Sequence, residues 1–225
     1  MEAQIRPLEL PAEHVVGCVH VGPKGANSYL HEALRHEVKA LLKASGVGFD
    51  PQDLTKHPAI LQRLKDAGYV RKPGSGLHKG GDILAMDIMG QPGQLGRNLE
   101  MVLDVTVTSK LGTTLDPLSE LMRLEKDKTA LYEKMYKLID CDVYGLAVDA
   151  WGNLGPNVLR LIEQCEKHVG LGWEGSVPSW ATWKCPTFKQ AWMYKFIVTM
   201  QVAGASKLAY AASRVRSSRA RRAQE

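Results

Sequence analysis

The sequence has few cysteines and no long apolar run. Its four cysteines, spread over 225 residues, form no CxxC pair, so we expect no disulfide framework and a reducing compartment. The residues after Met1 lack the apolar core of a signal peptide, and no apolar stretch reaches membrane-spanning length. We therefore expect a soluble, intracellular protein with no membrane partner, located in the nucleus if its source is eukaryotic.

The composition excludes an unfolded chain and favours a single domain. A hydrophobic fraction of 44% and a charged fraction of 24% are ordinary for globular proteins. The length of 225 residues suits one α/β core and is short for two. We expect an N-terminal arm over 1–27, a globular domain over 28–212 and a basic, disordered tail over 213–225.

Apolar periodicity predicts the elements of this domain. Helical spacing favours helices near 28–46, 60–65, 117–138, 157–168 and 187–215. Short apolar and β-branched runs favour strands at 82–89, 99–108 and 143–149. The last run is almost continuously apolar, as in a buried or parallel strand. The order of the elements predicts a three-layer α/β domain, with a small mixed sheet flanked by helices.

Two acidic residues at strand positions are the candidates for chemistry. Asp82 joins a Gly-rich loop to a strand, and Asp104 lies among apolar residues inside the next strand. A buried carboxylate is costly unless it is paired or binds a metal. Carboxylates on neighbouring strands can share a hard cation such as Mg²⁺ or Mn²⁺, which promotes phosphodiester hydrolysis by activating water. The structural alternatives are a turn cap for Asp82 and a buried lysine partner for Asp104.

Hydrolysis also needs a cationic group near the phosphate, and the helix after the second strand offers two. Lys128 shares a helix face with Glu125 and Tyr132, at spacings of three and four residues. Lys126 points about 160° away from Lys128, at about 100° per residue. We expect Lys128 to serve the site, with Lys126 in its place if the helix is rotated. Glu37, at the border of the first helix's apolar stripe, is either an accessory acid for the metal or a solvated residue.

Basic residues gather in a loop near residues 71–79 and at the C-terminal end of the chain. The last stretch has five arginines within nine residues and no acid before Glu225. Such segments are typical of nucleic-acid contacts, and a solvated tail without a specific partner is the alternative. The candidate phosphate contacts are Arg71, Lys72, Lys79, Arg214, Arg216, Arg219, Arg221 and Arg222.

These residues fall into an ordered set of motifs. They are Arg35-His-Glu37, Gly80-Gly-Asp82, Asp104-Val-Thr-Val107, Glu125-Lys-Asp-Lys128 with Tyr132, and Trp151 to Pro156. The set resembles the PD-(D/E)XK, or restriction-endonuclease-like, superfamily over roughly residues 30–215. More narrowly, it resembles nuclease-like regions attached to the reverse transcriptases of eukaryotic retroelements.

The resemblance implies a restriction-endonuclease-like core and a Mg²⁺-dependent deoxyribonuclease, with Asp82 and Asp104 as the metal ligands. Three positions depart from the family pattern. Glycine replaces the proline and alanine before Asp82, and Thr106 stands where the motif has its lysine. Members with the lysine moved to the following helix exist in the superfamily, and Lys128 or Lys126 fits that pattern.

Three functions follow from these observations. The first is a metal-dependent endonuclease that hydrolyses phosphodiester bonds in DNA. The second is a catalytically inactive nuclease fold that acts as a nucleic-acid-binding module. The third is an interaction domain that assembles through its long C-terminal helix, with a homodimer among the expected partners.

Overall fold

A mixed four-stranded sheet forms the centre of the domain. The computed structural model describes residues 26–50, 54, 57–69, 81–86, 100–108, 116–170, 185 and 187–222. Strands β1 (Gly48–Asp50), β2 (Ile83–Met86) and β3 (Glu100–Thr108) are antiparallel neighbours, and β4 (Asp142–Asp149) runs parallel to β3. The predicted α/β class is confirmed. We did not predict β1, because a three-residue strand is too short to show an apolar period.

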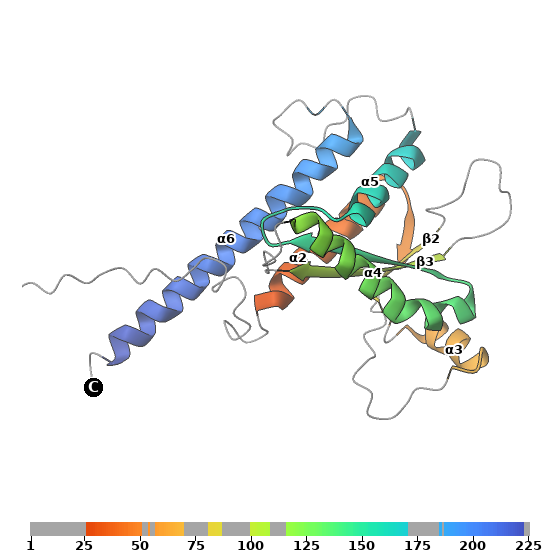
Figure 1. The fold of residues 1–225 in the computed structure, drawn as a ribbon, viewed down its shortest axis with the longest axis horizontal. Helices are drawn as coiled ribbons and strands as arrows, with labels where there is room; N and C mark the ends of the chain where they lie inside the picture. The colour runs from red at the N-terminus through yellow and green to blue at the C-terminus, as the bar shows by residue number, and fades with distance from the viewer. Residues whose placement is uncertain are drawn as a thin grey trace, which may run out of the picture.

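Helices cover both faces of this sheet (Figure 1). One face packs against α2 (Ala26–Ala44), α5 (Pro156–Val169) and α6 (Phe188–Arg222). The opposite face packs against α3 (Pro58–Asp66), α4 (Pro117–Tyr136) and the short helix η1 (Lys137–Ile139). Because α4 connects the parallel strands β3 and β4, it lies directly against both of them.

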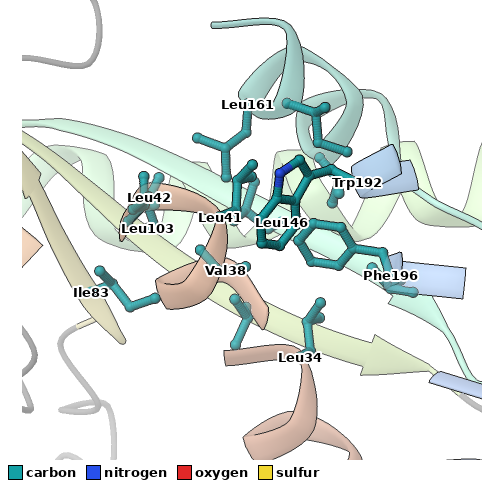
Figure 2. Close-up of a cluster of buried hydrophobic side chains, with 14 of the residues drawn as sticks. Leu34, Val38, Leu41, Leu42, Ile83, Leu103, Leu146, Leu161, Trp192 and Phe196 are labelled. Carbon is teal, nitrogen blue, oxygen red and sulfur yellow. The ribbon is translucent and has the colours of Figure 1, made fainter. Parts of the chain in front are cut away.

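The larger core lies between α2, the sheet and α6 (Figure 2). Apolar residues recur on α2 at three- and four-residue spacing, so they form one stripe that faces the sheet. Full burial of each such side chain contributes roughly 1.5–3 kcal/mol. The labelled members of this core are Leu34, Val38, Leu41, Leu42, Ile83, Leu103, Leu146, Leu161, Trp192 and Phe196.

The buried carboxylate of Glu125 joins α4 to β4 and α5. It accepts hydrogen bonds from the backbone N–H groups of Ala147, at 3.2 Å, and Asn157, at 3.0 and 3.1 Å. Asn157 is in the first turn of α5, where backbone N–H groups have no partner within the helix. A Cβ at Gly155 would lie 2.1 Å from Glu125 Oε1, so only glycine leaves room for the carboxylate there.

The C-terminal helix is longer than the sequence predicted. α6 continues to Arg222, so residues 213–222, which we expected in a disordered tail, are assigned to this helix. No proline or glycine follows Gly204, and alanine and arginine are strong helix formers. None of the helices in the described ranges is both long and apolar enough to cross a membrane.

Replacing Glu125 with alanine should destabilise the domain. The buried N–H group of Ala147 and the partly buried N–H group of Asn157 would lose their acceptor, at about 1–3 kcal/mol for a buried group left unsatisfied. Lys126→Ala, one residue along on the exposed side of α4, should change the free energy of unfolding by no more than about 0.5 kcal/mol. Urea denaturation of both variants checks this, and equal stability of the two would contradict it.

Candidate functional site

Asp104 is a buried acid on the face of β3 that packs against α4. Side chains alternate along the strand, so Asp104 follows Val102 toward α4 while Leu103 and Val105 face the larger core. Asp104 is 3% exposed, and its Oδ2 lies 2.8 Å from the Lys128 ammonium. Burial raises the pKa of Asp104, and the positive charge of Lys128 opposes part of that rise.

A glycine on β4 allows Lys128 to reach this acid. Gly145 is the β4 residue paired with Asp104. A Cβ at Gly145 would lie 2.4 Å from the Glu125 backbone oxygen and 2.7 Å from Lys128 Cβ. The Gly145 N–H donates to Thr129 Oγ1 at 3.1 Å. The absence of a side chain at Gly145 therefore lets α4 approach the sheet beside Asp104.

Asp82 reaches the same place from the beginning of β2. If the register of β2 on β3 is extended by one residue, Asp82 lies opposite Asp104. The Val105 N–H donates to Asp82 Oδ2 at 2.8 Å, so this carboxylate is held at the residue after Asp104. Gly81 precedes it with φ +66°, and a Cβ there would lie 2.3 Å from Val102 Cγ1. Glycine at position 81 therefore fits both the turn and the neighbouring strand.

Helix α2 brings positive charge to Asp82 that the sequence did not predict. His31 Nε2 lies 3.2 Å from Asp82 Oδ2. Its hydrogen bond to Asp82 raises the pKa of His31, while burial opposes the rise. Arg35 and Lys39 follow at four-residue spacing, and burial lowers the pKa of Lys39 while the charge of Asp82 raises it. The signal in the sequence was a basic residue at every fourth position beside the apolar stripe.

Tyr132 closes the site from α4. Its phenol is 5% exposed, and the Lys128 ammonium lies 6.0 Å from its ring centroid. Burial, with the charges of Asp104 and Asp82, raises the pKa of Tyr132 to about 12. The phenol is therefore neutral at physiological pH.

Other predicted residues lie elsewhere or outside the described residues. The Glu37 carboxylate pairs with Lys195 of α6 at 3.0 Å, so it fastens two helices together instead of facing Asp82 and Asp104. Lys126 is exposed, on a different side of α4 from Lys128. The predicted phosphate contacts Arg71, Lys72 and Lys79 lie outside the described residues, and those from Arg214 to Arg222 lie on α6.

The site offers a cation two carboxylates. Within the described ranges, no group of three or more His, Cys, Asp or Glu side chains is arranged to hold a metal ion. Mg²⁺, however, is commonly bound by one or two carboxylates, with waters and substrate phosphates as its other ligands. Asp104 Oδ2 is buried, and although Lys128 contacts it, no well-directed hydrogen bond reaches it. Asp82 and Asp104 therefore fit such an ion.

The charge contact between His31 and Asp82 should be visible by NMR in metal-free protein. His31 should titrate above its ordinary pKa of 6.5, and Asp82→Asn should lower that pKa. Because the folded pKa is raised, the pair stabilises the fold below pH 6.5, and this contribution is lost as pH rises through the folded value. It should be about 1 kcal/mol or less, since the pair is partly exposed. An unchanged pKa of His31 in Asp82→Asn would contradict the contact.

No protein-family model, no curated protein and no solved structure matches this chain.

Proposed function

We propose that the chain is a metal-dependent endonuclease that hydrolyses phosphodiester bonds in DNA, with Asp82 and Asp104 as ligands of Mg²⁺ or Mn²⁺. The observation that carries the proposal is the hydrogen bond of the Asp82 carboxylate to the residue after Asp104, whose own carboxylate contacts the Lys128 ammonium. The order of the motifs, which resembles that of PD-(D/E)XK nucleases of retroelements, supports the same function. A nuclear, intracellular location would follow for a DNA-cleaving protein of a eukaryote.

Each side chain has a role that its surroundings favour. A bound cation would lower the pKa of an attacking water and neutralise charge on the phosphate. Thr106 stands where the family motif has its lysine. Lys128 instead places an ammonium beside Asp104 from the following helix. Lys39 adds an ammonium and His31 adds a hydrogen-bonding imidazole on the α2 side of Asp82, where a DNA phosphate would need them.

The alternative is a catalytically inactive nuclease fold that binds nucleic acid. One observation favours it: the Lys128 ammonium contacts the same Asp104 oxygen that a cation would need. If a cation does not displace Lys128 from this ion pair, the charge of Asp104 stays neutralised by the lysine and the acid cannot bind a metal. A plasmid-nicking assay with and without Mg²⁺ separates the two functions. Metal-dependent nicking supports the enzyme, and binding without nicking supports the module.

Metal affinity should depend on the two strand acids. Asp82→Asn and Asp104→Asn should each weaken Mn²⁺ binding by more than the roughly 10- to 100-fold that loss of an outer partner costs. Asp127→Asn is the matched control, because Asp127 is on the exposed side of α4 and pairs with Arg123. Isothermal titration calorimetry measures the three affinities. Equal Mn²⁺ binding by all three variants would remove the acid pair from consideration as a metal site.

Lys128→Ala should reduce Mg²⁺-dependent cleavage by roughly 10²–10³-fold, the usual loss when one group that stabilises the transition state is removed. DNA binding in EDTA should change little. Lys126→Ala removes the same charge from the exposed side of the helix and should cleave at the wild-type rate. If Lys126→Ala is the impaired variant, Lys126 has the role; if neither variant is impaired, neither of these two lysines takes part in cleavage.

A further inference from the structure

The second half of α6 extends away from the domain (Figure 1). Ala203 and Gly204 are the last buried residues described on the helix, and Ala205, Ser206, Ala209 and Ser213 are exposed. We call residues 205–222 the distal arm. Its 18 residues would span about 27 Å at 1.5 Å per residue.

The two ends of α6 use their positive charges differently. The helix has eight basic residues and no acid over its 35 positions. Near its beginning, Lys189 pairs with Glu163 at 2.5 Å and Lys195 pairs with Glu37 at 3.0 Å, so these lysines fasten the helix to the domain. The other six basic residues are in the distal arm: Lys207, Arg214, Arg216, Arg219, Arg221 and Arg222.

The distal arm leaves the domain at the end of the sheet where the candidate site lies. A Cβ at Gly204 would be 3.3 Å from the backbone oxygen of Ala150, the residue that follows β4. The Ala150 N–H donates to the oxygen of Thr108, the last residue of β3, at 2.8 Å. Asp104 is four residues before Thr108 on that strand, and β2 begins opposite Leu103, the residue before Asp104. The arm therefore leaves the domain roughly 13 Å along β3 from Asp104, at about 3.3 Å per residue, and on the face of the sheet opposite the Asp104 side chain. A duplex bound to the arm has to pass around this end of the sheet to reach the two acids.

We infer that the distal arm is a helical extension that binds the phosphate backbone of a nucleic-acid duplex while the bond to be cleaved lies at Asp82 and Asp104. This inference rests on the proposed function. At about 100° per residue, the five arginine positions spread over about 220° of the helix circumference and leave about 140° without an arginine. That distribution suits a groove with phosphates on both sides, and the major groove of DNA admits a helix.

The composition of the arm favours a duplex over a lipid surface. Helices that bind membranes at the interface carry a face of large apolar residues, whereas Leu208, Tyr210 and Val215 are the only residues of that kind in the arm. A length of about 27 Å corresponds to about eight base pairs, at 3.4 Å per pair. The arm is therefore long enough to contact several consecutive phosphates.

Binding of the full-length chain to a 30-base-pair DNA duplex, measured by fluorescence anisotropy in EDTA, tests the arm without any cleavage. Replacing all five arginines with glutamine should weaken binding about tenfold or more. It should also make the dependence of log affinity on log salt shallower by up to about 4.5, at about 0.9 per phosphate contact. Unchanged affinity and salt dependence would overturn the inference.

A second pair of variants tests whether the arm binds as a helix. Ala209→Pro keeps every charge but breaks the helix beyond the core, so it should weaken binding several-fold, whereas Ala209→Ser should match the wild type. Circular dichroism reports the helix content, and thermal melting reports an intact domain. Wild-type affinity in Ala209→Pro would mean that the arginines act as an unstructured tail and would overturn the helical arm.

Two further outcomes separate this inference from its alternatives. If the wild type binds phosphatidylserine vesicles more tightly than the duplex, the arm is a lipid-binding element and the inference is overturned. If the arm variants lose duplex binding as expected but the wild type never nicks a plasmid with Mg²⁺, the arm stands as a duplex-binding element. In that case it is the proposed nuclease function that fails.

Discussion

The buried carboxylate of Asp104 requires a positive charge close by, and this requirement constrains the elements packed around it. An ionised acid at 3% exposure is costly unless positive charge lies within reach. Lys128 provides that charge only because α4 lies unusually close to β4, and α4 lies that close only because position 145 has no side chain. The same proximity brings the Glu125 carboxylate to the beginning of α5. The position of α4, the beginning of α5 and the charge balance of the site thus depend on one contact between a helix and a strand.

The other buried acids show why the Asp104 site is distinctive among the described residues. Glu37 has a single lysine partner, and Glu125 and Asp149 accept backbone hydrogen bonds that join elements or order a turn. In each of these arrangements, a structural role is enough to account for the buried acid. At Asp104, a second carboxylate is held one strand away, and His31 approaches from the opposite layer. Structural stability alone does not require two like charges there, because burying one acid with one lysine would cost less free energy than burying two acids.

Local patterns predicted much of this arrangement, and long-range packing decided the rest. Helical spacing on α4 was enough to separate Lys128 from Lys126, and strand positions were enough to select Asp82 and Asp104. The same face argument grouped Glu125 with Lys128, but it could not reveal that the Glu125 carboxylate points to α5, because that depends on space left by Gly155. Glu37 finds its partner more than 150 positions later in the chain, and His31 meets Asp82 across 51. The spacing of residues along one helix or strand does not reveal pairs that lie so far apart in the chain.

The helical arm was missed for a different reason: arginine-rich composition suggested a solvated tail, although alanine and arginine both favour a helix.

The proposed duplex-binding arm is continuous with a helix that packs on the domain. Two ion pairs, Lys189 with Glu163 and Lys195 with Glu37, fix the first turns of α6 to α5 and α2. The close approach of Gly204 to Ala150, which follows β4, also sets the direction in which the helix leaves the domain. A helix leaving in a fixed direction holds its charges at a defined distance from Asp82 and Asp104, whereas a flexible tail would sample many distances. If the arm holds a duplex, the phosphate presented to the acid pair is selected by the length of that helix, and the position of cleavage relative to the bound segment would be constant.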